Sequence, residues 1–398
     1  MNFSKSYDIA VIGAGIAGVA AAVQAARDGK KVVLLEKTVF PGGLATTGLV
    51  YIYLPICDGN GHQVSFGITE ELLKLSVKYG PGTIPEHWKN NVNASEPNRY
   101  RCIFSPAAYI LALDEYLKEN NVEVWYDTLV CDTEVENDRI TAVFVENESG
   151  RGEIRAKCFV DASGTAILAR RANIPCHTAT NFLAWWEIRY DSRVEQSDLG
   201  APLRLNMGGI PWDEAKAPEG TLFRGINGKS VTEFVTRGRE KILEQYKAQY
   251  SDSLTRENFY SVKLPAMPQF RKIYSIDARY VLRDNENNKH FADSIGLAAD
   301  WRKAGPVWEI PYDSLIPSAG PKGFIAAGRC TGADGDAWEV TRVIPVAGMT
   351  GQVAGLAASM AIDAGITPDE LNVNDLQAKL RTLGFPLFLP EVGLDYDK

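Results

Sequence analysis

The sequence is poor in the side chains that bind metals or form disulfide bonds. Only 4 of its 398 residues are histidines, and they lie too far apart to form an H-x-x-H or H-x-x-x-H pattern. Its 6 cysteines form no C-x-x-C pair. Zinc sites and vicinal redox disulfides need such close spacings. We therefore expect no metal centre and interpret the cysteines as buried thiols.

The sequence also has no basic excess and no long apolar run, and we expect no leader segment. The formal net charge is −8, whereas a nucleic-acid partner needs a basic face. Glycine or charge interrupts the apolar runs before they reach the length of a membrane span. Residues 1–6 hold no apolar signal core. These features predict a cytoplasmic protein without nucleic-acid or membrane partners, and its length indicates two domains.

The first 36 residues contain a strand, a glycine-rich turn and a helix in an informative order. An apolar strand at 8–12 runs into Gly13-Ala14-Gly15-Ile16-Ala17-Gly18. An alanine-rich helix follows to about residue 28, and a second strand, 32–35, ends on Glu36. This is a G-x-G-x-x-G turn in the strand–helix–strand context of a dinucleotide-binding fold.

Each part of this motif has a physical role in binding a dinucleotide. Gly13 allows a tight turn, Gly15 lets the backbone approach a pyrophosphate, and Gly18 allows the helix to pack closely on the strand. Free N–H groups at the helix start would meet the anion. Glu36, 21 residues after Gly15, would accept hydrogen bonds from ribose hydroxyls and repel the 2′-phosphate of NADP. The alternative is an ordinary glycine-rich turn in an α/β domain.

The rest of the chain predicts a mixed α/β protein of two domains. We expect helices near 67–80, 106–119, 231–250 and 345–364, a long loop at 81–100, a buried strand at 323–328, and short strands at 122–126, 129–136, 140–145 and 154–160. The predicted fold is a Rossmann-like nucleotide-binding domain, a parallel sheet with a β-meander, into which an α+β substrate or cap domain is inserted. The first comprises residues 1–50, 100–180 and 318–398. The second comprises residues 51–99 and 181–317, where the tryptophans concentrate: Trp185, Trp186, Trp212, Trp301 and Trp308.

A second glycine-rich region, near the C-terminus, favours FAD over NAD. Gly328-Arg329-Cys330-Thr331-Gly332 follows a strand, and a helix then starts near Pro345. The N-terminus of that helix offers free N–H groups and the positive end of the helix dipole, which can stabilise negative charge on a reduced flavin. Gly348, Gly351 and Gly355 would admit a flat ring, or would equally serve close helix packing. A flavin dinucleotide needs one motif for its pyrophosphate and a distant one for its ring, as found here.

These motifs resemble those of FAD-dependent oxidoreductases related to glutathione-reductase-type and fumarate-reductase-type flavoproteins. More narrowly, the chain resembles a bacterial group in which some members carry a xanthan lyase label. The matching stretches are 8–37, 41–49, 159–164, 310–317, 327–330 and 342–358. The resemblance implies non-covalent FAD in an extended pose, bound by Gly13, Gly15, Ile16, Ala17, Gly18, Glu36, Lys37, Gly43, Leu44, Ala45, Val130, Ala162, Gly164, Gly328, Arg329, Val346 and Gln352.

The same resemblance implies where parts of the cofactor would lie. Gly43 to Ala45 would line the ribityl chain and the ring, Val130 would meet the adenine edge through its backbone, and Arg329 would lie near the ribityl-phosphate. The chain departs from the group where Thr165-Ala166 replace acidic residues, where an arginine-rich run near 270–274 is reduced to Arg271, and where a histidine near residue 300 is missing. These departures predict an untypical substrate pocket.

Three residues between the ring-binding strand and the ring-binding helix are the candidates for chemistry. Asp336 or Glu339 would carry the proton that accompanies hydride transfer, and Arg342 would orient a carboxylate or polarise a carbonyl. Alternatively, Arg342 only pairs with one of the two carboxylates and stabilises the loop. Weaker candidates are Cys57, Asp58, Tyr312, Arg271 and Arg279.

Four functions remain open from the sequence. The leading one is an FAD-dependent oxidoreductase that transfers hydride between the flavin and a small polar metabolite, such as a sugar or hydroxy acid. The others are a flavin-dependent lyase or isomerase of carbohydrate breakdown, a flavin-binding protein that is non-catalytic or acts in RNA modification, and an NAD enzyme. No second G-x-G-x-x-G turn follows a strand, so the flavin would exchange electrons with an unidentified donor or acceptor.

Overall fold

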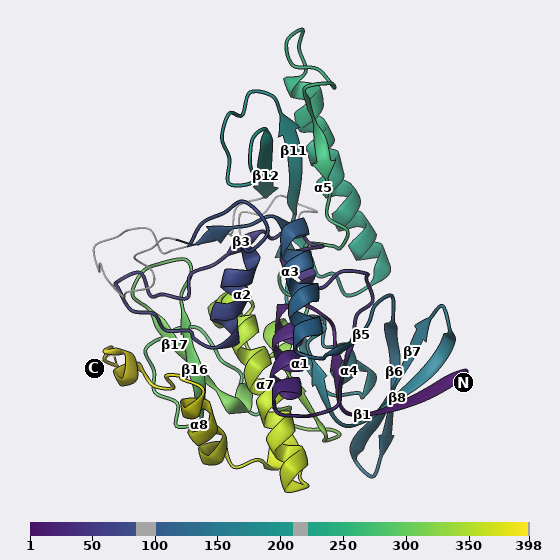
Figure 1. Ribbon diagram of the computed structural model, residues 1–398, viewed down its shortest axis with the longest axis vertical. Coiled ribbons are helices and arrows are strands. Elements are labelled where there is room, and N and C mark those ends of the chain that lie inside the picture. The colour runs from purple at the N-terminus through teal and green to yellow at the C-terminus, as the bar shows by residue number, and fades with distance from the viewer. Residues whose placement is uncertain (85–100, 210–221, 397–398) are drawn as a thin grey trace.

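The computed structural model describes residues 1–84, 101–209 and 222–396 (Figure 1). Most of the loop predicted at 81–100, and Trp212, lie outside the described residues. The α-helices are α1 (Ile16–Arg27), α2 (Ile68–Ser76), α3 (Pro106–Glu119), α4 (Ile167–Arg171), α5 (Gly228–Gln249), α6 (Gly335–Thr341), α7 (Ile344–Ala364) and α8 (Val373–Thr382).

A seven-stranded sheet forms the centre of the molecule. Its order is β5 (Glu123–Trp125), β2 (Val32–Leu35), β1 (Phe3–Ile12), β8 (Gly150–Asp161), β7 (Arg139–Asn147) and β6 (Leu129–Glu136), with β18 (Phe324–Ala326) paired to β8. The pairs β5·β2, β2·β1, β1·β8 and β18·β8 are parallel, and β8·β7 and β7·β6 are antiparallel. The predicted parallel sheet with a meander is thereby confirmed.

Strand β8 joins the meander to the parallel part of the sheet. Its first half pairs with β7 and with the start of β1, and its last residues pair with β1 and β18. Because the meander extends the sheet in this way, β1 begins at Phe3 and not at the predicted Asp8. Ser4 and Ser6 are exposed, so no apolar pattern marks this part of the strand.

The sheet is buried on both faces. Along β1, Ile9 and Val11 lie in one core with α1 and α7, whereas Ala10 and Ile12 lie in a second core with Leu168 of α4. Two buried faces are typical of parallel sheets, and they explain why residues 9–12 of β1 and the whole of β2 are apolar without polar alternation.

Helix α7 packs along α1 and against the sheet (Figure 1). Its length and hydropathy would suffice to cross a membrane, although from the sequence we expected no apolar run of that length. In the structure, however, 94% of its most apolar window is buried inside the molecule. A Cβ on Gly351 would collide with the carbonyl oxygen of Ala17, and one on Gly355 with that of Ala21. Close helix packing is therefore the role of these two glycines, as the alternative interpretation held.

A smaller antiparallel sheet forms the cap, with the order β12 (Leu203–Gly209), β11 (Ala184–Asp191) and β14 (Phe259–Lys263). The long helix α5 lies beside it (Figure 1). Phe234, Ile242 and Tyr246 form the buried side of this helix, and the Asn227 side chain caps its start by accepting the Ser230 N–H at 2.9 Å.

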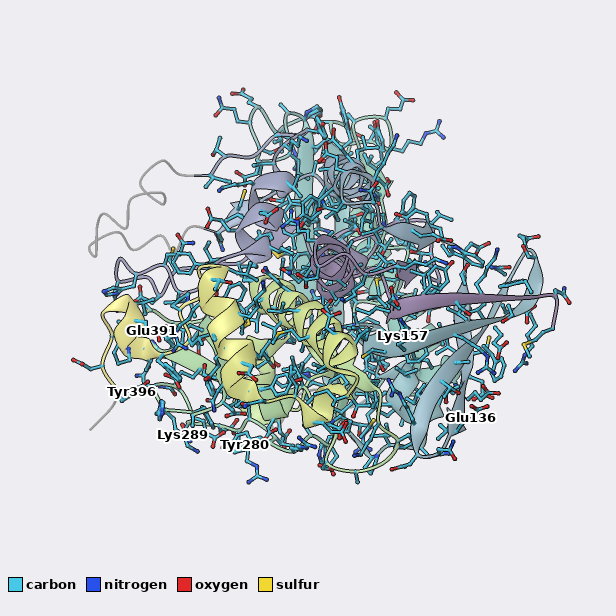
Figure 2. All side chains as sticks on the ribbon, turned by 60° about the horizontal axis from the view of Figure 1, so that its bottom comes forward. Glu136, Lys157, Tyr280, Lys289, Glu391 and Tyr396 are labelled. Carbon is cyan, nitrogen blue, oxygen red and sulfur yellow. The ribbon has the colours of Figure 1, made fainter. Side chains whose placement is uncertain are left out.

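The remaining strands form two-stranded pairs: β3 (Ile52–Tyr53) with β4 (Cys102–Ile103), β9 (Cys176–Thr178) with β15 (Tyr274–Ile276), β10 (Asn181–Phe182) with β13 (Leu222–Phe223), and β16 (Ser294–Ala299) with β17 (Val307–Pro311). The β16–β17 hairpin falls in the range predicted for the cap but packs beside α7 and α8 (Figure 1). Tyr396, labelled in Figure 2, donates to the buried carboxylate of Glu309 in β17 at 2.6 Å, which ties the C-terminal segment to this hairpin.

The contact between α1 and α7 can be tested with two helical glycines. Gly351→Ala places a methyl group against the Ala17 carbonyl, so we expect the free energy of unfolding to fall by about 1–3 kcal/mol in urea titrations. Gly228→Ala, at the start of α5 where nothing lies within 4 Å of a new Cβ, should leave stability unchanged or raise it by up to about 1 kcal/mol. Equal effects of the two substitutions would contradict this account of the packing.

Candidate active site

The glycine-rich turn leaves one open face at the start of α1. Gly13 has φ +93°, and a Cβ there would lie 2.8 Å from Ser163 Cα. At Gly18 a Cβ would collide with the Gly13 carbonyl oxygen, whereas at Gly15 the nearest atom, Ala162 O, would be 3.9 Å away. Gly15 is also the N-cap of α1 and supplies no side-chain cap. The first N–H groups of the helix therefore face a space of the kind that a pyrophosphate fills.

Glu36 stabilises this turn from the end of β2. Its carboxylate is 7% exposed. One oxygen accepts the Ala14 N–H at 2.8 Å, and the other accepts the Thr38 N–H and hydroxyl, each at 2.9 Å. A carboxylate has about four acceptor sites, so these bonds leave room for a ribose hydroxyl. The ribose contact itself stays a prediction.

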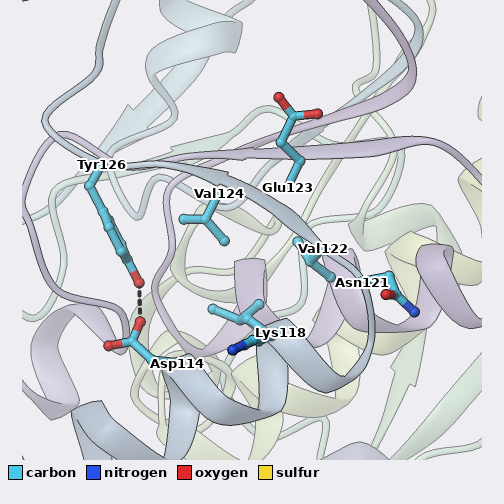
Figure 3. Close-up of a pocket in the computed structure, with 8 residues that line it drawn as sticks. Asp114, Lys118, Asn121, Val122, Glu123, Val124 and Tyr126 are labelled. Carbon is cyan, nitrogen blue, oxygen red and sulfur yellow. Dashed lines mark hydrogen bonds between the residues drawn. The ribbon is translucent and has the colours of Figure 1, made fainter.

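Two hollows lie near this end of the sheet. One, of about 330 Å³, is lined by Lys37, Asp127, Leu129, Glu146, Asn147 and Glu148. The Thr128 N–H donates to the Glu36 carbonyl at 2.9 Å, so this hollow adjoins the predicted ribose position, with Val130 next along β6. The other, of about 440 Å³, lies between α3 and β5, where Tyr126 donates to Asp114 (Figure 3). It contains none of the predicted site residues.

The turn predicted to line the flavin ring lies directly beside the pyrophosphate turn. Gly43–Ala45 forms one turn of 3₁₀ helix, which includes Leu44. The Gly42 N–H donates to the Ala14 carbonyl at 2.7 Å, and a Cβ on Gly43 would lie 3.1 Å from Gly15 Cα. Any side chain at residue 43 would therefore crowd the pyrophosphate turn.

The start of α7 completes this region. Gly328 has φ +66°, and a Cβ there would lie 2.9 Å from Ala17 Cβ. Its N–H donates to the Thr350 hydroxyl at 3.0 Å, which attaches the segment after β18 to α7. Val343, the N-cap of α7, supplies no side-chain cap, so N–H groups near Val346 remain without helical partners. Two uncapped helix starts thus meet beside one glycine-lined space.

Arg329 lies beside Gly164 at one side of this space. A Cβ on Gly164, two residues after Ala162, would collide with the Arg329 guanidinium. Burial lowers the pKa of Arg329 to about 10, and repulsion from Arg342 acts in the same direction. A desolvated cation is costly unless an anion pairs with it. The residues in this space therefore fit the doubly anionic pyrophosphate and the elongated shape of FAD.

The side chain of Gln352, one of the predicted cofactor residues, lies between three helices. Gln352 lies in the third turn of α7 and is 3% exposed. Its side-chain oxygen accepts the Ile68 N–H at 2.7 Å, and its nitrogen donates to Gln24 at 2.8 Å. Both ends of the amide are used between helices α1, α2 and α7, so a contact of Gln352 with the cofactor stays a prediction that these bonds do not support.

The three residues predicted for chemistry separate into two groups. Arg342 donates to Glu339 through Nε at 2.9 Å, and Lys272 contacts the other Glu339 oxygen at 2.9 Å. The side chains of Arg342 and Glu339 are only 8% and 12% exposed. Asp336 points away from them, is 55% exposed and pairs with Arg302. Glu339 and Arg342 thus form a buried ion pair, and Asp336 lies outside it.

A segment of the cap, Ala266–Lys272, crosses this region, and we call it the strap. Its Ala266 N–H donates to the Thr47 carbonyl at 2.8 Å, and the Gln269 amide donates to the Gly48 carbonyl. At its other end the Arg329 guanidinium donates to the Phe270 carbonyl. The strap therefore closes over the turn predicted to line the ring. Sequence reasoning missed Lys272, which no local pattern distinguishes from a surface lysine.

Three of the weaker candidates, Tyr312, Arg279 and Asp58, make contacts that stabilise the fold. Tyr312 is buried and donates to the Pro368 carbonyl at 2.8 Å, and Arg279 lies at the surface near Asp369. Asp58 is fully buried and accepts from His62 Nδ1 at 2.9 Å. The spacing of four residues between Asp58 and His62 is a signal that sequence reasoning had overlooked.

Comparisons with known proteins agree with this geometry. A family model described as FAD dependent oxidoreductase matches residues 8–183 and 184–380. Protein FixC of Bradyrhizobium diazoefficiens is 26% identical over 56% of this chain and 51% of its own length. Digeranylgeranylglycerophospholipid reductase of Methanoculleus marisnigri is 30% identical over 43% of this chain and 42% of its own length. Thioredoxin reductase of Ureaplasma parvum is 46% identical over 18% of this chain and 23% of its own length. The chain thus spans about half or less of these curated relatives.

Solved structures show the same fold. A geranylgeranyl bacteriochlorophyll reductase-like protein from Thermoplasma acidophilum matches with a TM-score of 0.50 and 13% identity, over 96% of this chain and 83% of that chain. The narrower xanthan lyase label is not confirmed by these matches. The family model covers nearly the whole chain, from the glycine-rich turn through the cap to α8. On this evidence the chain belongs to the FAD-dependent oxidoreductase family and is an enzyme with FAD as its cofactor.

Proposed function

We propose that the enzyme transfers hydride between its flavin and a small polar metabolite, such as a hydroxy acid or a sugar. The observation that supports this is the buried polar cluster beside the ring turn. Glu339, Arg342 and Lys272 lie where the strap crosses from the cap to the start of α7. A cluster of this kind binds oxygen-bearing groups and excludes purely apolar substrates.

The residues of the cluster have different tasks in this proposal. FAD supplies the hydride chemistry, and the protein supplies orientation and electrostatics. Burial acts to raise the pKa of Glu339, but Arg342 and Lys272 lower it below its usual value. Glu339 is therefore a carboxylate at neutral pH and a weak base, so it positions Arg342, and Arg342 orients a substrate oxygen.

We also propose that the enzyme acts in the cytoplasm on a small molecule, with a separate electron donor or acceptor and without nucleic-acid or membrane partners. The acidic net charge and the burial of α7 within the fold support this.

The reaction type can be tested by anaerobic bleaching of the holoenzyme. We expect one member of a panel of hydroxy acids and sugars to remove the oxidised-flavin absorption bands, which should return when oxygen is admitted. Anaerobic turnover of a panel member with no electron acceptor present and no change in the flavin spectrum would instead establish non-redox lyase or isomerase chemistry.

A substitution at Gly15 tests FAD binding without disturbing the fold. Because a Cβ there meets nothing closer than 3.9 Å, Gly15→Ala should leave the urea unfolding midpoint of the FAD-free protein unchanged. The methyl group would occupy the pyrophosphate space, so we expect FAD affinity to fall about tenfold or more, measured by fluorescence titration. Gly228→Ala is the matched control with normal affinity. Unchanged FAD affinity of Gly15→Ala would place the pyrophosphate elsewhere.

Substitutions of Glu339 and of Asp336 form a matched pair that tests which of the two carboxylates acts in the active site. Glu339→Gln removes the charge that holds Arg342, so kcat/KM should fall by about tenfold or more while FAD remains bound. Asp336→Asn alters an exposed pair with Arg302 and should change kcat/KM less than about twofold. The opposite order of effects would return Asp336 to the catalytic site.

A further inference from the structure

Four cationic side chains gather where the strap meets the start of α7. Arg271 and Lys272 come from the strap, Arg329 from the segment after β18, and Arg342 from the end of α6. The carboxylate that the structure pairs with them, among the described residues, is Glu339, which contacts Lys272 and Arg342. Positive charge therefore exceeds negative charge in a region largely removed from water.

Among the described residues, no carboxylate lies within ion-pair distance of Arg271, unlike Lys272 and Arg342. Burial, together with repulsion from Arg342 and Arg329, lowers the pKa of Arg271 to about 9, and the attraction of Glu339 opposes this shift. Its guanidinium donates a long hydrogen bond, 3.3 Å, to the Gln269 carbonyl and lies 5.2 Å above the ring of Trp186. A guanidinium has five N–H donors, so most of them are available to a ligand.

The side chain of Arg271 is not closed off from solvent. Its side chain keeps intermediate exposure although its charge is strongly desolvated. Trp186 lies on β11 of the cap, and its ring is 5.2 Å from the ring of Tyr51 beside β3. Arg271 thus lies beside the cap sheet at Trp186, whereas Arg329 is the arginine that lies against Gly164.

We propose that Arg271 and Arg342 bind a carboxylate group of the substrate, and so select an organic acid over a neutral sugar. This rests on the proposed function, which it narrows. Arg329 lies against Gly164 and serves the doubly negative pyrophosphate, whose charge leaves about one cation of the cluster without a counter-ion. A single carboxylate restores the balance, and the fork of a guanidinium binds it through two parallel hydrogen bonds.

Titration of the FAD-loaded enzyme with malonate tests this directly. We expect a saturable change of the flavin absorption spectrum that sodium chloride at equal ionic strength does not produce. Arg271→Met should weaken malonate binding by about 10- to 100-fold, since charge-assisted hydrogen bonds are lost. Arg342→Lys keeps the ion pair with Glu339 but not the fork, and we expect a similar weakening. Arg279→Met, a surface arginine near Asp369, is the matched control with unchanged binding.

The outcomes separate this assignment from its alternatives. Malonate binding that is equal in Arg271→Met and in the unsubstituted enzyme would overturn it, as would loss of FAD from Arg271→Met, because the cluster would then serve the cofactor. Inorganic phosphate binding as tightly as malonate through Arg271 would refute the carboxylate preference. If malonate binds through Arg271 and Arg342 but no metabolite bleaches the flavin, the anion site stands and the hydride-transfer proposal fails.

Discussion

The close contact between α1 and α7 is the constraint on which the rest of the site depends. Gly351 and Gly355 bring α7 against the carbonyl oxygens of Ala17 and Ala21, nearer than any side chain would allow. Each helix begins without a side-chain cap, and the two starts lie beside the same glycine-lined space. The distance between the predicted pyrophosphate site and the predicted ring site is therefore determined by helix packing, which is rigid because protein interiors are close-packed.

The strap, a segment of the cap, brings positive charge to the start of α7, the helix that packs against α1. The strap is attached to Thr47 and Gly48 at one end and to Arg329 at the other, and it carries two cations toward the buried Glu339–Arg342 pair. Buried cations destabilise a protein unless anions compensate their charge. Ligands that bind only the folded state stabilise it, so FAD and an anionic substrate would each strengthen the closed arrangement of cap and strap.

The local parts of the fold were predictable from the sequence because short-range signals determine them. The helix at 106–119 has the predicted bounds, since Pro106 occupies its first position and the Ser105 side chain caps it. The strand–turn–helix around Gly15 followed from glycine geometry. Strand β1 was predicted to begin late, because Phe3 to Ser6 join the sheet through pairing with β8, a partner some 150 residues away. Pairing of this kind leaves no local pattern in the sequence.

In the candidate site, too, parts that depend on local backbone geometry were predictable, and parts that tertiary structure brings together were not. The family resemblance implied that Gln352 binds the cofactor, whereas the structure directs its amide to Gln24 and Ile68. Arg271, Arg329 and Arg342 are separated by 58 and 13 residues, and each alone is an ordinary arginine. The strap, held by a backbone bond to a distant turn, brings Arg271 close to Arg329 and Arg342. Cofactor recognition, which depends on local backbone geometry, is therefore readable from the sequence, whereas substrate recognition depends on charges that tertiary structure assembles.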